Sequence, residues 1–260
     1  MTRRNLTIGE RCHSSRAILL ALLGLGIAFA TTAGAAVTST FDTDADGWVG
    51  ISCPNPGLVC GDTLLGPGKF SYEPNGGSSG VDPDGFIKST DPDSGNAARI
   101  FAPEKFNNAL ALNKRLTFDL TIFPDPLGGT TIDQIPPPIL SIAGAGRVLV
   151  YAGAIPGFNS WSSYDVLLNN TGNTPGTEDS WVVFSGGPTP NAAIEADFLA
   201  VFADADARLS ITGEFINDGE GLFDSVGLDN VNLVPIPAAL PLLASALFGI
   251  GFARRASAQR

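Results

Sequence analysis

The stretch Leu116-Thr117-Phe118-Asp119-Leu120-Thr121-Ile122-Phe123 decides the fold class, because it has the length and the β-favouring residues of a strand. Glycine, proline and asparagine divide the chain around it into further apolar runs of the same kind. These expected strands are 148–154, 164–168, 181–184, 209–215 and 226–234. We therefore expect a domain built from short strands joined by turns.

The overall composition points to the same class. The chain has 31 glycines and 19 prolines, only 16% of its residues are charged, and long amphipathic helical stretches are scarce. One short helix is predicted between residues 194 and 204, where four apolar residues fall on one helical face. They are Ile194, Phe198, Leu199 and Phe202. The predicted class is all-β with this single short helix.

The N-terminal end has the layout of a secretory signal peptide. Four arginines lie within residues 1–16, an apolar run follows at 17–30, and small residues occupy 31–36. This order predicts a signal peptide over residues 1–35, cut at the box that contains Ala33 and Ala35, and therefore handling by the secretion machinery. The alternative, a permanent membrane helix, needs a longer apolar span.

The C-terminal end carries a second targeting pattern. The motif Val234-Pro235-Ile236-Pro237-Ala238 precedes an apolar run at 239–253 and the pair Arg254-Arg255. The run is marginal for one bilayer crossing, and the arginines would place the tail in the cytoplasm and the domain outside. Considered alone, this segment predicts a weak membrane anchor.

Together the three parts of this tail resemble the PEP-CTERM sorting signals of Gram-negative bacteria, in the variant that opens Val-Pro-x-Pro-Ala. The resemblance covers residues 234–260 and includes a hydrophobic sorting helix. It implies an exosortase-type transpeptidase as partner, transient membrane retention, and delivery to the cell surface or into extracellular polysaccharide. An ordinary tail anchor is the alternative. The residues that carry the motif are Val234, Pro235, Pro237, Ala238, Arg254 and Arg255.

Removing the two ends changes the charge and the chemistry of what remains. Seven of the 15 basic residues and one of the 26 acidic residues lie in the ends, so the rest has a net charge of −17, against −11 for the whole chain. Such an excess repels nucleic acid and anionic lipid, so we expect no nucleic-acid partner and membrane contact only through the C-terminal segment. The single histidine, His13, lies in the signal, which excludes Ser-His-Asp catalysis and His-ligated zinc.

Between the ends, an ordered set of motifs spans residues 41–233. Phe101-Ala102-Pro103-Glu104-Lys105-Phe106 leads into the strand Leu116-Thr117-Phe118-Asp119-Leu120, and Leu228-Asp229-Asn230-Val231 closes the set. This order resembles a laminin B (laminin IV type A) domain, here predicted over residues 36–233. The resemblance implies a jelly-roll-like antiparallel β-sandwich, related in shape to carbohydrate-binding modules, with a role in adhesion or matrix structure. Two stretches depart from the family pattern, 52–79 and 124–138, and are expected to form surface loops.

Carboxylates near the first strand raise the question of calcium. Asp42, Asp44, Asp46 and Gly47 match the opening of an EF-hand loop, but the position of the closing glutamate holds Cys53, so an EF-hand is rejected. The resemblance to carbohydrate modules implies instead one structural calcium bound near Asp42 and Asp229. The alternative is a solvated acidic turn. No other cofactor is expected.

The remaining cysteines and aromatic residues have structural interpretations. Cys12 leaves with the signal, so Cys53 and Cys60 form an even pair in an oxidising compartment, which predicts a disulfide, with two free thiols as the alternative. The tryptophans and tyrosines could form a stacking platform for sugars, but their places near predicted strands favour core positions. They are Trp48, Trp161, Trp181, Tyr72, Tyr151 and Tyr164.

Three functions are compatible with the sequence. The preferred hypothesis is an exported cell-surface or matrix protein with a non-catalytic structural or adhesive β-sandwich. The second is a carbohydrate-binding module for extracellular polysaccharide. The third is an acid-pair glycosidase, which needs only two suitably separated carboxylates. No particular pair can be singled out among 25 acidic residues, and the chain is predicted not to be an enzyme.

Overall fold

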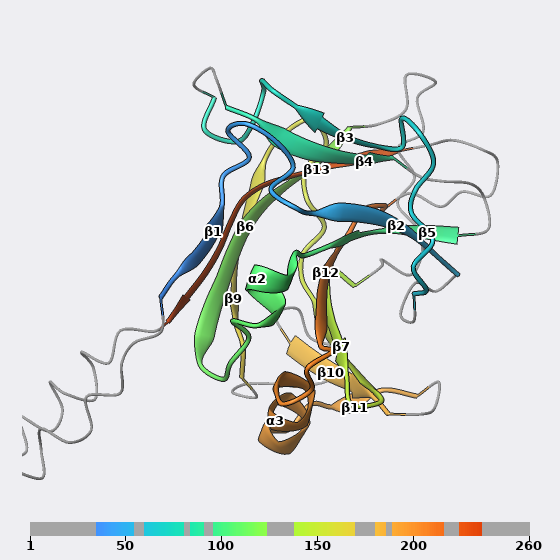
Figure 1. The fold of residues 1–260 in the computed structure, drawn as a ribbon, viewed down its shortest axis with the longest axis vertical. Helices are drawn as coiled ribbons and strands as arrows, with labels where there is room; N and C mark the ends of the chain where they lie inside the picture. The colour runs from blue at the N-terminus through green and yellow to red at the C-terminus, as the bar shows by residue number, and fades with distance from the viewer. Residues whose placement is uncertain are drawn as a thin grey trace, which may run out of the picture. The chain divides into compact units, whose positions relative to one another are not determined.

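The computed structural model describes residues 35–54, 60–80, 84–90, 96–123, 138–169, 180–185, 189–215 and 224–235. These residues form two antiparallel β-sheets packed into a sandwich, with two short helices (Figure 1). The predicted all-β class is therefore confirmed. Ala33, the apolar run at 17–30 and the residues of the predicted sorting tail from 236 onward lie outside the described residues. Within the described part of the chain, no helix is long and apolar enough to cross a membrane.

The first sheet has strand β13 near its centre. In the described residues it contains six strands in the order β3-β4-β13-β6-β9, with β1 also paired to β13. Strand β13 pairs with β6 along one side, and with β4 and then β1 along the other. The bounds are β1 (Val37–Ser39), β3 (Phe70–Glu73), β4 (Phe86–Thr90), β6 (Lys114–Phe123), β9 (Ser162–Leu167) and β13 (Ser225–Pro235).

The second sheet has seven strands in the described residues, in the order β11-β10-β8-β7-β12-β5-β2. Its edge strand β2 is followed along the chain by Leu64, which bridges back to Ile51, so that part of this edge is covered. The bounds are β2 (Val49–Pro54), β5 (Asn96–Phe101), β7 (Leu140–Gly144), β8 (Arg147–Ala152), β10 (Ser180–Phe184), β11 (Asn191–Ala192) and β12 (Arg208–Thr212).

The core lies between the sheets and follows from strand alternation. On β6 every second side chain is buried, from Leu116 through Phe118 and Leu120 to Ile122, and each is at most 1% exposed. Residues of the second sheet, such as Leu140 and Ile211, belong to the same cluster. Full burial of one such side chain stabilises the fold by about 1.5–3 kcal/mol. The intervening residues of β6 therefore face outward.

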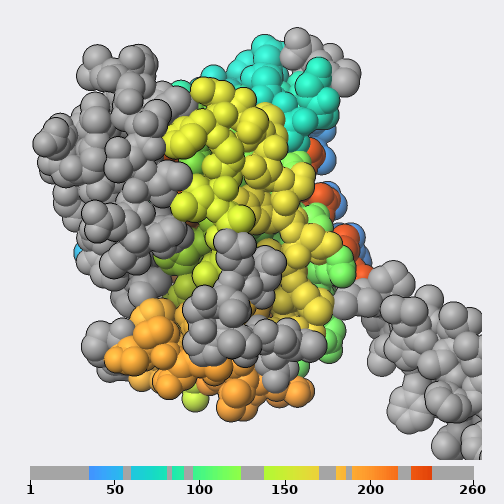
Figure 2. Space-filling model, turned by 180° about the vertical axis from the view of Figure 1, so that it is seen from behind, coloured from blue at the N-terminus to red at the C-terminus, as the bar shows by residue number. Residues whose placement is uncertain are grey.

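Two helices complete the core. Helix α2 (Glu104–Asn107) buries Phe106 against Trp48, with ring centroids 5.3 Å apart. Helix α3 (Glu195–Phe202) buries Phe198 and Val201. Figure 2 shows the opposite side of the molecule, where the yellow segment around β8 and β9 lies above the orange residues of β10 and α3.

The predicted helix is confirmed, but its expected buried face was wrong in part. Ile194 and Leu199 are 57% and 52% exposed, whereas Val201, which the prediction omitted, is fully buried. Helix α3 packs against β7 and β8, and these contacts select Phe198 and Val201, three residues apart on one face. Periodicity alone did not reveal which side of the helix the sheet would cover.

The N-terminal third differs most from expectation. The strong runs correspond to β6, β8, β9, β10, β12 and β13, as predicted, and the structure adds β1, β2 and β3 among residues 37–73, for which no strand bounds were predicted. The expected surface loop at 52–79 contains the end of β2 and all of β3, whose residues are only half-buried. Most of the second expected loop, 124–137, lies outside the described residues. Strand β13 continues to Pro235, two residues past the predicted domain end.

Candidate functional site

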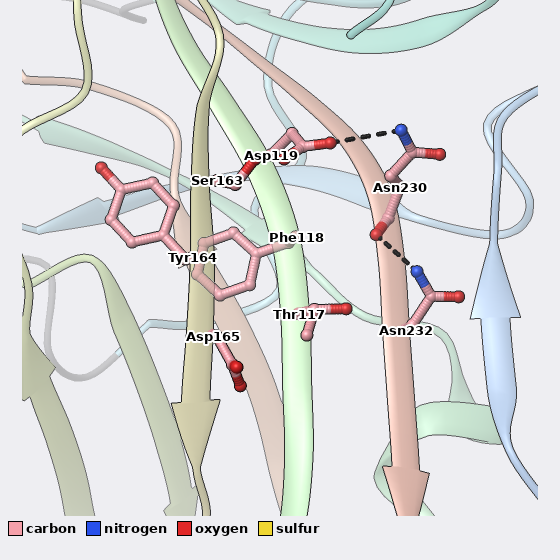
Figure 3. Close-up of a pocket in the computed structure, with 8 residues that line it drawn as sticks. All are labelled: Thr117, Phe118, Asp119, Ser163, Tyr164, Asp165, Asn230 and Asn232. Atoms are coloured by element: carbon pink, nitrogen blue, oxygen red, sulfur yellow. Dashed lines mark hydrogen bonds between the residues drawn. The ribbon is translucent and has the colours of Figure 1, made fainter. Parts of the chain in front are cut away.

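A groove of about 340 Å³ crosses three neighbouring strands of the first sheet (Figure 3). Strands β6, β9 and β13 all contribute to it. Its volume is at the lower end of the range for small-molecule sites, about 300–1,000 Å³. The lining residues are Thr117, Phe118, Asp119, Ser163, Tyr164, Asp165, Asn230 and Asn232. We call this feature the groove.

Strand alternation places the polar groove residues on the outer face of the sheet. Thr117 and Asp119 alternate with the core residues of β6, and the register pairs them with Asp165 and Ser163 of β9. Phe118 and Tyr164 stack on each other with ring centroids 5.0 Å apart and pack with the core. The groove is therefore a polar surface above an aromatic layer.

An irregularity in β13 brings two asparagines to the groove. The pairing of β13 with β6 shifts register between Asp229 and Asn232, and Asn230 has a φ of 49°. Such a bulge places one extra residue on one strand and redirects its side chain. As a result Asn230 and Asn232 both line the groove, and the Asn232 amide donates to the main-chain oxygen of Asn230 at 2.8 Å (Figure 3).

Asp119 is the hub of the hydrogen bonds in the groove. Its Oδ2 accepts from the Ser78 hydroxyl at 2.7 Å and from the Asn230 amide at 3.2 Å (Figure 3), and its Oδ1 accepts from the Ser163 hydroxyl at 2.5 Å. Asp165, at the other side, forms an exposed ion pair with Arg115. Both oxygens of Asp119 are thus engaged, which holds the side chains of the groove in one arrangement.

A buried carboxylate pair, Asp84 and Asp229, lies beside the groove beneath the turn 77–80. Asp229 is 0% exposed and accepts from the main-chain NH groups of Ser78 and Asn230 at 2.8 and 2.7 Å. Asp84 is 7% exposed and accepts from the NH groups of Ser79 and Gly80 at 2.7 and 3.1 Å. These NH donors replace water around both carboxylates.

The two carboxylates converge at Gly77. A Cβ at this position would lie 2.7 Å from both Asp229 Oδ2 and Asp84 Cγ, so only glycine fits without displacing them. Burial, together with the charge of Asp84, raises the pKa of Asp229, although hydrogen bonds from Ser78 and Asn230 act in the opposite direction.

The two residues predicted to share calcium have different surroundings. The Asp42 side chain is exposed and accepts from the Thr40 hydroxyl at 2.7 Å, whereas Asp229 contacts the turn 77–80. Nearby, Asp44 accepts the main-chain NH of Asp46, and Asp46 pairs with Lys105, as in a solvated acidic turn. Among the described residues, no group of three or more acidic, histidine or cysteine side chains is placed to hold a metal.

Sequence reasoning missed Asp84 as the partner of Asp229. The available signal was the glycine- and serine-rich run 76–80 just before it, whose main-chain NH groups suit carboxylates. Although the Asp42 carboxylate points elsewhere, the preceding main chain is close to this region. A Cβ on Gly85 would lie 2.2 Å from the Phe41 oxygen.

The aromatic residues divide between core and surface. Trp48 and Trp181 are each 2% exposed, which confirms the core interpretation for these two. Trp161 is half-buried above the first sheet, donates from Nε1 to the Gly76 oxygen at 3.3 Å, and packs edge-on against Phe86. A Cβ on Gly227 would lie 2.9 Å from the Trp161 ring, so this glycine lets the ring approach the strand.

The predicted disulfide between Cys53 and Cys60 is confirmed. Cys53 is fully buried and packs with Ile51 and Phe101, and Cys60 packs against the same cluster. These residues form a small apolar group separate from the main core. The disulfide therefore fixes Cys60 against the second sheet.

No family model and no curated protein matches this chain. Two solved structures resemble it at low similarity. One is an exo-β-agarase, with 16% identity, a TM-score of 0.38, and coverage of 66% of this chain but only 24% of the agarase. The other is the K1 cleaved adhesin domain of Lys-gingipain from Porphyromonas gingivalis W83, with 13% identity, a TM-score of 0.27, and coverage of 78% of this chain and 99% of that domain. The function has to be argued from the residues of the site itself.

The groove and the carboxylate pair suit binding better than acid–base chemistry. A glycosidase needs two carboxyl groups that reach the substrate from opposite sides. Asp84 and Asp229 are buried beneath the turn 77–80, and both oxygens of Asp119 already accept hydrogen bonds. The arrangement offers hydroxyl, amide and carboxylate groups to a ligand that is recognised through hydrogen bonds.

Proposed function

We propose that this chain is an exported cell-surface or matrix protein whose β-sandwich is a non-catalytic structural and adhesive module. The observation that carries the proposal is the state of the site carboxylates. Those beneath the turn 77–80 are shielded from substrate, and Asp119 serves as a hydrogen-bond hub. Carboxylates in these roles stabilise a surface, and the exposed Asp165 of the groove is paired with Arg115.

Two experiments test this proposal. Cells that lack the protein should attach less well to surfaces or to one another, and the full chain supplied in trans should restore attachment. The mature protein from the culture medium or outer surface should release no reducing sugar from the isolated extracellular polysaccharide. Sugar release would refute the non-catalytic role and favour the acid-pair glycosidase.

A second candidate function is carbohydrate binding, and the groove favours it. Sugar sites combine an aromatic face with convergent polar groups. The half-buried Trp161 lies directly before β9, and the Gly76 and Ser78 contacts link its ring to Asp119. A glycan array probed with the mature protein tests this function, with Trp161→Ala as the matched variant. If Trp161→Ala binds glycan as well as the wild type does, the glycan site lies away from Trp161.

The proposed destination rests on the two ends of the sequence. We propose that the signal is removed at the box ending in Ala35, and that an exosortase-type transpeptidase processes the tail before Arg254. Val234 and Pro235 belong to the motif and also pair with Arg115 and Lys114 in the first sheet. Processing that preserves the sheet therefore falls after Pro235. Mass spectrometry of the surface and medium fractions tests this, because a mature form that keeps Arg255 would contradict it.

The laminin-B-like classification remains a proposal that the motif order supports.

The calcium hypothesis is retained in a modified form. Calcium prefers carboxylate and carbonyl oxygens, and Asp229 with Asp84 provides such donors beside Gly77, whereas Asp42 faces solvent. A structural ion there would oppose the repulsion between the two carboxylates. Calorimetric titration of the EDTA-treated protein tests it: no heat with calcium and an unchanged melting temperature would exclude the ion.

A further inference from the structure

The charges around the groove are the starting point. Its lining contains Asp119 and Asp165 and neither lysine nor arginine, and the buried carboxylate pair lies beside it. Arg115 reaches one side, where it pairs with Asp165. The part of the chain between the two targeting segments has a net charge of −17. An anionic ligand approaching this surface is repelled both locally and by the whole domain.

The hydrogen-bonding groups suit hydroxyls. Asp165 is 52% exposed and can accept from a ligand, the Asn232 amide can donate, and the Thr117 hydroxyl can do either. A sugar hydroxyl also donates and accepts, and a hydroxyl that donates to a carboxylate forms a charge-assisted bond. A carboxylate or sulfate group on the ligand could only accept, and it would face Asp119 and Asp165.

The position of Trp161 extends this surface. The turn that contains Gly76 and Ser78 contacts Trp161 at one end and Asp119 at the other, so ring and groove are adjacent. Trp161 also packs with Phe86, which in turn lies 5.6 Å from Phe123, and this cluster supports the ring. A pyranose has an apolar face that matches such a ring, with hydroxyls around its rim.

We infer that the groove binds a neutral, hydroxyl-rich glycan and excludes polysaccharides that carry carboxylate or sulfate groups. Thr117 and Asp165 set this preference, and Trp161 supplies the stacking face. The inference rests on the proposed carbohydrate-binding function and specifies its ligand class.

The test compares matched neutral and anionic polymers. The mature protein is run by native affinity electrophoresis through gels that contain dextran or agarose, and through gels with carboxymethyl-dextran or sulfated agarose. We expect retardation in at least one neutral polymer and little in its anionic counterpart. Trp161→Ala should weaken binding to the neutral polymer by about tenfold. Trp161→Phe, which keeps a ring, should lose less, and circular dichroism verifies that both variants fold.

A charge substitution tests the origin of the preference. Thr117→Lys places a cation between Asp119 and Asp165, and should raise binding to the anionic polymer several-fold while weakening binding to the neutral one. Thr63→Lys adds the same charge at an exposed site outside the first sheet and should change neither. Equal or stronger wild-type binding to the anionic form, or equal effects of the two lysines, would overturn the inference. No binding of the wild type to any polymer would instead remove the carbohydrate-binding function itself.

Discussion

On the outer face of the first sheet Asp229 is a buried carboxylate, whereas on the outer face of the second sheet Arg99 is a buried guanidinium. Arg99 is 2% exposed, and burial lowers its pKa to about 9. It donates to the Ser141 hydroxyl at 2.8 Å, to the Pro138 oxygen at 2.9 Å, and to both oxygens of Ser210. Its acceptors are neutral hydroxyl and carbonyl groups.

The two outer faces also differ in what surrounds the buried charge. On the second sheet, Arg99 is surrounded by hydrogen-bond partners, and the disulfide fixes an apolar group around Ile51 and Phe101. On the first sheet, main-chain NH groups satisfy the buried carboxylates, and the neighbouring groove remains open to solvent. The outer face of the second sheet thus holds its buried cation among hydrogen-bond partners, while the groove lies on the outer face of the first sheet.

The largest effect is expected at Arg99. Arg99→Ala removes the donor for four acceptors, three of them buried, and leaves a cavity, so the free energy of unfolding should fall by about 3 kcal/mol or more. Chemical denaturation measures it. Arg115→Ala breaks only an exposed ion pair and should cost less than about 1 kcal/mol. Similar losses for the two variants would contradict the burial and the hydrogen bonds of Arg99 described above.

The disulfide should contribute the next largest effect. The bridge limits the conformations of the short loop between Cys53 and Cys60 in the unfolded chain. Replacing both cysteines with alanine removes this limit and should lower the free energy of unfolding by about 2–3 kcal/mol. The melting temperature of the variant, and of wild type after reduction and alkylation, should fall together. Binding at the groove should be unchanged, because the bridge lies on the other sheet. A loss of binding would show that the two faces are coupled.

Gly77 tests the convergence of the carboxylate pair. Gly77→Ala introduces a methyl group 2.7 Å from atoms of Asp84 and Asp229, and should destabilise the fold by about 1–3 kcal/mol. Gly61→Ala is the control, since nothing lies within 4 Å of its Cβ. Equal stability of the two variants in thermal melts would contradict the tight packing of the turn 77–80.

The smallest effect is a pH dependence at Asp229. Because its pKa is raised in the folded protein, the folded state binds more protons than the unfolded state just above the ordinary value of 3.8. The stability due to this group is present below that value and is lost as pH rises through the higher folded pKa. Asp229→Asn should therefore gain stability relative to wild type as pH rises through this window, measured by melting temperature.

The sequence predicted correctly those elements that depend on residues close together in the chain. Strand β6 and strand β13 have strong apolar runs, and the cysteine spacing identified the disulfide. Strand β3 was missed because all its residues are half-buried, so it has no buried apolar alternation, and its strand conformation comes from pairing with β4. In the site, Asp229 was named but its partner was not, since the turn at Ser78 reaches it from 151 residues away. Contacts of that kind depend on the whole topology.

The central place of β13 has a consequence for how the protein folds. Val37 pairs with Leu233, and β4 and β6 also need β13 as their neighbour, so the first sheet is held together by contacts between distant parts of the sequence. Assembly that waits for such contacts is slow, because loop closure must precede them. Until residues 225–235 emerge, β1, β4 and β6 have no common neighbour. The first sheet of the described residues is therefore completed only after its last strand in the sequence has been made.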